Sequence, residues 1–189
     1  MQGIFPESLK CAKVIPLHEE GPRTDVTNYK PISLLYVLYK IYQRIMQTRL
    51  FNHLQSNGIK FHNSQYEFRA GHSSEHAILE AQNKITQAID KKKIALLLLV
   101  DFSKAFDMVE HDILLRKLEH YGVRGVHLRW FASYLHNRKQ YVNIDNASSE
   151  KHLIKYAVPQ GSILGPTLFI VYINDLPEIS KLAKFIFFL

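Results

Sequence analysis

The sequence contains a single cysteine, Cys11, and its histidines show no paired spacing typical of metal ligands. One cysteine excludes a disulfide within the chain and a cysteine-rich zinc site, so a reducing, intracellular compartment fits best. The longest uninterrupted apolar run, Ile94–Val100, is far shorter than the roughly 20 residues that cross a bilayer. The chain also lacks an opening charged-then-apolar leader, and we therefore expect neither a signal peptide nor a membrane partner.

Acidic residues are in the minority. The 189 residues include 24 lysines and arginines against 17 aspartates and glutamates, which gives a net charge of +7. Hydrophobic residues make up 47% of the chain, enough to bury the core of one sizeable domain or two small ones. The excess of positive charge suits a polyanionic partner, so composition alone leaves a nucleic-acid binder and an ordinary basic enzyme equally open.

The first half of the chain reads as a strand followed by two helices. Ala12–Leu17 is apolar but contains Pro16, which predicts a short edge strand. A helical period then runs from Ser33 until Asn57-Gly58 ends it. The residues expected on its buried face are Leu34, Leu38, Ile41, Ile45, Leu50 and Leu54. Ser73 or Ser74 caps a second helix, whose apolar stripe comprises Ile78, Ala81, Ile85 and Ala88.

In the second half, the seven apolar residues Ile94–Val100 lack polar alternation and predict a central strand buried on both faces. The pattern that follows predicts helices over 109–121 and 128–135, a hairpin of strands 141–144 and 153–158, and a helix from Pro166 to Leu176. The last residues, Phe185–Leu189, are apolar with no turn after them. Domains rarely stop inside a hydrophobic strand, so we expect a truncated domain.

Two short segments could carry chemistry. Asp101 directly follows the expected central strand, a common place for catalytic and metal-binding carboxylates, although an isolated aspartate there is more often a helix cap. Asp107 could pair with it, which would be a weak signal for Mg²⁺. Pro159-Gln160-Gly161-Ser162 is either a turn that approaches a ligand closely or a plain structural turn.

Five motifs occur in a specific order along the chain. They are NYKPISLL at residues 28–35, QYEFRAGHSS at 65–74, VDFSKAFD at 100–107, VPQGSILGP at 158–166 and YINDLP at 172–177. Together they closely resemble the reverse transcriptase of non-LTR (LINE-type) retrotransposons, over nearly the whole chain. The resemblance implies an α+β, right-hand polymerase fold.

In that fold, residues 1–93 form the fingers region, residues 94–189 form a partial palm with inserted helices, and the thumb is absent. The implied activity is RNA-directed DNA synthesis by two-metal nucleotidyl transfer. Its partners are an RNA template, a DNA primer and deoxynucleoside triphosphates, and its cofactor is a pair of Mg²⁺ ions.

The resemblance also assigns roles to individual residues. Asp101 matches the palm carboxylate that binds both Mg²⁺ ions, and the carbonyl of Phe102 matches an auxiliary ligand. Phe106 matches the steric gate, an aromatic ring that excludes the ribose 2′-hydroxyl. Asp107, just beyond the gate, is expected to have a structural or capping role.

Other implied residues surround the nucleotide. Gln160 and Gly161 match the turn that packs beside the nascent base pair. Arg69 and Lys30 match finger residues that meet the incoming triphosphate.

The sequence departs from the family pattern at several positions. Glu67 and Ala157 replace glycines, Lys30 replaces an arginine, and Glu19-Glu20 replace lysines. The aromatic-x-Asp-Asp turn that follows YINDLP in the family is not present, and the second metal-binding carboxylate belongs to that turn. We therefore expect the chain itself to be inactive. The alternatives are a non-catalytic remnant that binds RNA or a heteroduplex, and a product that does not fold.

Overall fold

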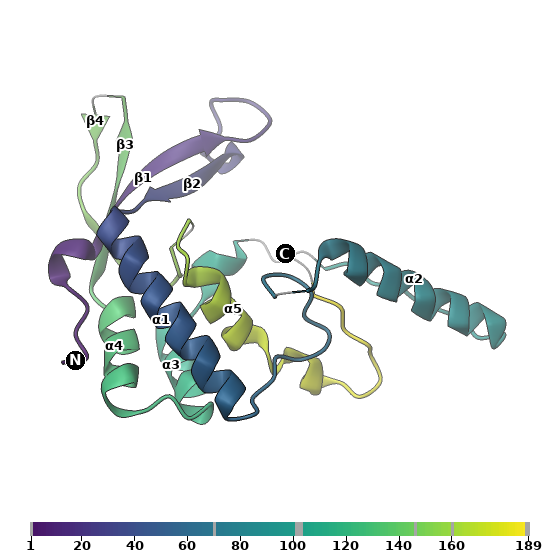
Figure 1. Cartoon of the computed structure of the whole chain (residues 1–189). Helices are drawn as coiled ribbons and strands as arrows, with labels where there is room; N and C mark the ends of the chain where they lie inside the picture. Colours follow the sequence, from purple (N-terminus) through teal and green to yellow (C-terminus); the bar gives the residue numbers. More distant parts are fainter. Residues whose placement is uncertain (1, 70, 101–103, 146, 160, 188–189) are drawn as a thin grey trace. The chain divides into compact units, whose positions relative to one another are not determined.

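The computed structural model describes residues 2–69, 71–100, 104–145, 147–159 and 161–187 (Figure 1). The chain divides into two compact units. Unit 1 consists of Met1–Ile59 and Lys104–Tyr172, and unit 2 consists of Lys60–Ser103 and Ile173–Leu189. The mixture of helices with a β-sheet agrees with the expected α+β class at that coarse level.

Unit 1 contains a five-stranded sheet with the order β2-β1-β3-β4, in which β5 also pairs with β3. The strands are β1 (Cys11–His18), β2 (Tyr29–Leu34), β3 (Arg138–Ile144), β4 (Ala147–Ser148) and β5 (His152–Ile154). The first strand was predicted, but its edge position was wrong, because β1 lies between β2 and β3. Pro16 is tolerated there because the β1–β3 register covers only Cys11–Val14, so Pro16 lies beyond it.

Helices and short 3₁₀ turns are the other elements of unit 1, and the helices gather below the sheet in Figure 1. The helices are α1 (Val37–Ser56), α3 (His111–His120), α4 (Gly125–Leu135) and α5 (Gly165–Ile173), with 3₁₀ turns η1 (Glu7–Leu9), η2 (Val26–Asn28) and η3 (Ala105–Met108). The expected helices are confirmed, but α1 starts later than predicted, because residues 29–34 pair with β1 as a strand.

The buried face of α1 differs from the predicted one. Its buried residues are Tyr39, Gln43, Met46, Leu50 and Leu54, whereas Leu38, Ile41 and Ile45 are exposed. The helix has apolar residues on two faces. The buried face is the one with the aromatic and amide side chains, because Tyr39 and Gln43 both form hydrogen bonds with the buried hydroxyl of Tyr134 on α4.

An aromatic cluster joins Phe5, near the N-terminus, to helices α1 and α4. The ring of Trp130 stacks on Tyr134 with centroids 5.4 Å apart, and the edge of Phe5 meets Trp130 at 5.6 Å. Phe5 also contacts Tyr39, at 5.4 Å. These rings are almost completely buried, so they contribute both apolar burial and specific ring geometry to unit 1.

Unit 2 contains α2 (Ser74–Asp90) and the 3₁₀ turn η4 (Leu176–Ile179). Ser73 is the N-cap of α2 and its Oγ accepts a hydrogen bond from the backbone N–H of His76, which confirms the predicted cap. Near the end of the chain, Phe187 forms a parallel bridge with Gln65. Among the described residues of both units, no helix is long and apolar enough to cross a membrane.

The prediction of a buried strand at Ile94–Val100 is wrong. These residues form no strand in the structure, and Ile94 is 99% and Leu98 79% exposed. A strand buried on both faces needs neighbours at both edges and a layer on each face. None of the described strands pairs with this segment, so its composition alone does not bury it.

Candidate functional site

The segment around Phe106 is bonded directly to the residues that lead into the Pro-Gln-Gly turn. The backbone N–H of Val158 donates to the carbonyl of Phe106 at 2.9 Å, and that of Ala157 donates to the carbonyl of Val109 at 2.9 Å. His111 Nε2 donates to the carbonyl of Ala157 at 2.8 Å. Two motifs separated by about 50 residues in the sequence are therefore neighbours in unit 1.

Phe106 is half-buried in η3, where its ring lies 5.1 Å from the ring of Phe169 on α5, at an interplanar angle of 42°. Phe169 is buried and fixes one side of the Phe106 ring. Sequence reasoning did not find Phe169 as a support, because only the tertiary fold brings α5 against η3.

Gly161 adopts a φ of +84°, a conformation that side-chain-bearing residues rarely take. A Cβ atom at this position would lie 3.4 Å from the backbone carbonyl oxygen of Ser33 in β2. The backbone N–H of Ser162 closes the turn on the carbonyl of Pro159 at 3.1 Å, and Ser162 Oγ accepts from the N–H of Gly165 at the start of α5. The expected tight turn at this glycine is confirmed.

Two glutamines of α1 hold the other end of this turn. Gln43 Oε1 accepts from the backbone N–H of Ile163 at 3.0 Å. Gln47 Nε2 donates to the carbonyl of Ile163 at 3.1 Å and to Thr167 Oγ1 at 2.9 Å. Sequence reasoning missed both residues, although two amides four positions apart among apolar neighbours are a usable signal for one polar contact surface.

The remaining expected site residues are distributed unevenly. Asp101, Phe102 and Gln160 lie outside the described residues. In unit 1, Lys30 Nζ lies 3.3 Å from Glu19 Oε1. Glu19, which stands where the family pattern has a lysine, therefore forms an ion pair with Lys30. In unit 2, Arg69 Nη1 donates to the carbonyls of His62 at 2.9 Å and Gln65 at 3.0 Å, and burial lowers its pKa.

Asp107 is half-buried in η3, and its backbone N–H donates to the carbonyl of Lys104 at 2.8 Å. Burial raises the pKa of its carboxyl, while the charge of Lys104 opposes that shift. Its side chain lines a cavity beside the sheet, so the expected structural or capping role stays a prediction.

The described residues contain no group of three or more histidine, cysteine, aspartate or glutamate side chains that could hold a metal ion. The ligands implied by the resemblance, the carboxylate of Asp101 and the carbonyl of Phe102, are both oxygen donors. Oxygen donors are what Mg²⁺ prefers, so the chemistry of this donor set fits the ion.

Both glycine replacements have structural consequences. Ala157 has a φ of +89°, in the region that favours glycine, which explains a glycine at this position in the family pattern. Glu67 does not share that conformation. Instead its carboxylate accepts a hydrogen bond from Ser74 Oγ, beside the cap of α2.

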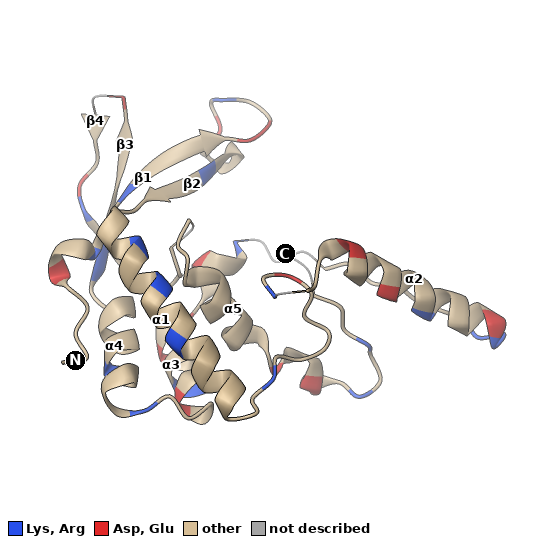
Figure 2. Cartoon of the chain, in the orientation of Figure 1, with Lys and Arg blue, Asp and Glu red and all other residues tan. Residues whose placement is uncertain are grey.

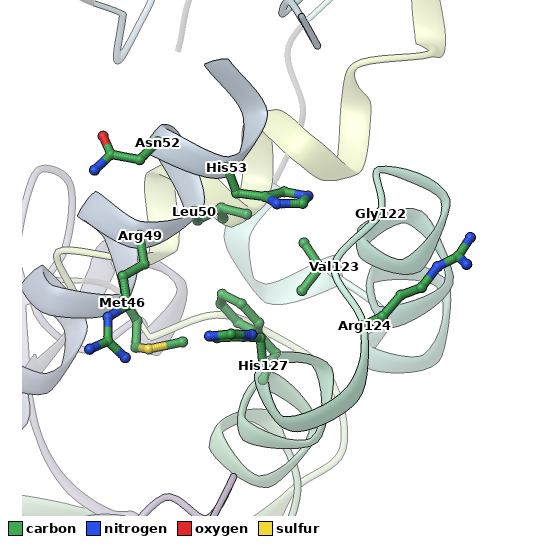
Figure 3. Close-up of a pocket in the computed structure, with 10 residues that line it drawn as sticks. Met46, Arg49, Leu50, Asn52, His53, Gly122, Val123, Arg124 and His127 are labelled. Atoms are coloured by element: carbon green, nitrogen blue, oxygen red, sulfur yellow. The ribbon is translucent and has the colours of Figure 1, made fainter. Parts of the chain in front are cut away.

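A separate pocket of about 460 Å³ lies between α1 and the residues around the start of α4 (Figure 3). Met46 and His127 approach each other across it, while Arg124 extends away. His53 Nε2 donates to the carbonyl of Tyr121 at 2.9 Å. None of the residues expected to act on a nucleotide lines this pocket.

The mixed architecture, together with the bonded motifs around Phe106 and Gly161, is consistent with a polymerase domain of the reverse transcriptase type. The chain belongs to the reverse transcriptase (RNA-dependent DNA polymerase) family, which it matches over residues 18–189. It is 34% identical to the probable RNA-directed DNA polymerase from transposon BS over 180 residues. It is also 35% identical to the RNA-directed DNA polymerase from mobile element jockey over 178 residues, both from Drosophila melanogaster.

These matches cover 92% and 93% of this chain and 19% of each relative. The chain thus spans about a fifth of the length of these relatives. A probable RNA-directed DNA polymerase from transposon X-element of the same species is 32% identical over 175 residues. The resemblance to the reverse transcriptases of non-LTR retrotransposons is confirmed.

Proposed function

We propose that this chain supplies the fingers, residues 1–93, and part of the palm, residues 94–189, of an enzyme that copies RNA into DNA. The observation that carries the proposal is the bond between the Val158 N–H and the Phe106 carbonyl. This bond joins the motif at residues 100–107, which contains Phe106, to the motif at residues 158–166, which contains Gly161. Both motifs must be neighbours if they are to surround one nucleotide. The substrates are an RNA template, a DNA primer and deoxynucleoside triphosphates.

Phe106 acts as the steric gate in this proposal. A gate must resist displacement when a 2′-hydroxyl presses against it, and the contact with the buried Phe169 ring provides that resistance. Gly161 lets the backbone of the following turn approach the base pair without a side chain between them.

Asp101 and the carbonyl of Phe102 would hold the Mg²⁺ ions. When bound, these ions activate the primer 3′-hydroxyl and stabilise the leaving pyrophosphate. Arg69 and Lys30 would meet the triphosphate. Arg69 already donates through Nη1 to two backbone carbonyls, which orients the guanidinium and leaves its other N–H groups for phosphate oxygens.

Helix α1 offers a surface for the nucleic acid. Figure 2 shows basic positions and no acidic position along it, and the sequence places Lys40, Arg44 and Arg49 there. All three are exposed. Lys40 and Arg44 are four positions apart and therefore lie on the same side of the helix, whereas Arg49 lies on the opposite side. The pair of basic side chains, in a chain of net charge +7, would attract a phosphate backbone in a salt-dependent way.

A chimera tests the proposal, because the chain covers only part of its relatives. This chain replaces the matching segment of the jockey polymerase, and primer extension on RNA is measured with deoxy- and ribonucleotides. We expect the chimera to be active, Asp101→Asn to abolish synthesis, and Phe106→Val to keep DNA synthesis while admitting ribonucleotides. Asp145→Asn is the matched control, since Asp145 is exposed and its φ of +48° suits asparagine. Full activity of Asp101→Asn would contradict the assignment.

A further inference from the structure

One face of the sheet in unit 1 borders a cavity of about 300 Å³. The strand register pairs Arg138 with Ile154, Gln140 with Ala12, and Val14 with Ser33. Side chains that alternate along paired strands emerge on the same face, so these six residues share the face that borders the cavity. Pro31, Asp107 and residues 155–159 line the rest of it.

Arg138 is the unusual member of this lining, because it is only 1% exposed. Its Nη1 donates to the hydroxyl of Tyr39 at 2.6 Å, and its guanidinium lies 5.2 and 5.4 Å from the ring centroids of Tyr39 and Tyr134. These contacts fix one edge of the guanidinium between two aromatic rings.

The other edge has no partner. Within the described ranges, neither Nε nor Nη2 of Arg138 forms a hydrogen bond, and the side chain forms no ion pair. A buried charge without a counter-charge is strongly unfavourable. The faces of the two aromatic rings offset only part of that cost.

We propose that this cavity is a phosphate-binding site in which Arg138 binds two phosphate oxygens through Nε and Nη2. That edge of a guanidinium presents two parallel N–H groups, which match two oxygens of one oxyanion. Among the described residues expected to act on the nucleotide, neither Phe106, Lys30 nor Arg69 lines this cavity.

The rest of the lining favours a phosphate over a carboxylate. Lys155 and Gln140 are exposed residues of the same cavity and supply further donors. A tetrahedral phosphate has oxygens left for them after the bidentate contact, whereas a carboxylate does not. Asp107 also lines the cavity and opposes an anion when ionised, so its neutralisation should strengthen binding.

The first test observes Arg138 directly in the 189-residue chain. The Nε–H resonance of Arg138, in protein labelled with ¹⁵N-arginine and assigned by its loss in Arg138→Lys, is followed during titration with inorganic phosphate. Ionic strength is kept constant with chloride, and acetate is titrated in parallel. We expect a saturable shift with phosphate and a much weaker response to acetate. An unchanged resonance, or equal affinity for both anions, would overturn the proposal.

Variants give a second, independent test by equilibrium binding of phosphate. We expect Arg138→Met to weaken binding at least about tenfold. Lys155→Ala, which alters an exposed side chain and therefore keeps the fold, should weaken it about threefold, and Asp107→Asn should tighten it. If Lys155→Ala and Asp107→Asn both leave the affinity unchanged, the cavity does not hold the anion.

A competition experiment identifies the source of the phosphate. A short RNA is added to the phosphate-loaded protein while the Arg138 resonance is followed. Competition that is lost in Arg138→Lys assigns the site to a backbone phosphate of the nucleic acid. No competition assigns it to a free phosphate. Either result is independent of whether the chimera polymerises DNA, so failure of one proposal does not decide the other.

Discussion

Two segments of this chain are rich in large apolar residues and have opposite fates. In α4, Trp130, Phe131 and Tyr134 are buried, with Phe5 against Trp130 and Tyr39 of α1 bonded to Tyr134. Residues 94–100 contain only isoleucine, alanine, leucine and valine, yet every one of them is exposed. The more uniformly hydrophobic segment is therefore the less buried one.

The difference lies in what each segment can pair with. A helix satisfies its own backbone hydrogen bonds, so α4 needs only a complementary face, and α1 with Phe5 provides one. An extended segment needs neighbouring strands for its N–H and C=O groups before burial becomes favourable. Apolar composition is thus a condition for burial, whereas the supply of partners decides whether burial occurs.

Substitutions in the two segments should differ most in their effect on stability. We expect Trp130→Ala to lower the free energy of unfolding by about 3–5 kcal/mol, because it removes a buried ring with contacts to Phe5 and Tyr134. Leu98→Ala, the matched control, should change it by less than about 0.5 kcal/mol. Urea unfolding measures both. A large loss in Leu98→Ala would mean that residues 94–100 are packed in solution.

Sequence patterns predicted best what depends on local contacts. The helices α3 and α4, the cap at Ser73 and the turn at Gly161 all follow from residues within a few positions of each other. Strand β2 was missed, because its pairing partner β1 decides its conformation and Pro16 and Pro31 face each other in that register. Residues 94–100 were misplaced for the same reason.

In the candidate site too, the residues that were missed are those that depend on contacts between distant parts of the sequence. The motif order predicted Phe106 and the glycine turn as parts of one site, through a resemblance rather than from spacing. The supports Phe169, Gln43 and Gln47 were missed, since each acts across 60 to 120 residues of sequence. Arg138 was missed because a single arginine in an alternating strand gives no sign that it is buried.

Tertiary contacts in unit 1 also hold one alanine in a backbone conformation that alanine rarely adopts. Ala157 is held at a φ of +89° by bonds to Val109 and His111. Non-glycine residues in this region cost about 1–3 kcal/mol, so we expect Ala157→Gly to stabilise unit 1 by about 1 kcal/mol despite the greater freedom of the unfolded chain.

Ala147→Gly is the control for that measurement. Ala147 is exposed in β4 and does not have a positive φ. Glycine there relieves no strain, and we expect a loss of about 0.5–1 kcal/mol. Urea unfolding of both variants separates the two effects, and a loss of stability in Ala157→Gly would show that the left-handed conformation carries no strain.

The smallest expected effect is electrostatic and concerns His111, which is buried in α3. Burial lowers the pKa of His111 from its ordinary value of 6.5, and the charges of His136 and Arg138 act in the same direction. The bond to the Ala157 carbonyl and the charge of Asp112 oppose the shift but do not reverse it.

Because its folded pKa is depressed, His111 stays neutral in the folded state at a pH where the unfolded chain binds a proton. Its contribution to stability is therefore complete above pH 6.5 and is lost as the pH falls through the folded pKa. We expect the free energy of unfolding to fall less steeply between pH 7 and pH 5 in His111→Gln, whose amide can still donate to Ala157. Above pH 7 the two curves should run parallel, because histidine is then neutral in both states. Equal slopes below pH 6.5 would show that burial in unit 1 leaves this imidazole free to titrate, as in a segment without packing partners.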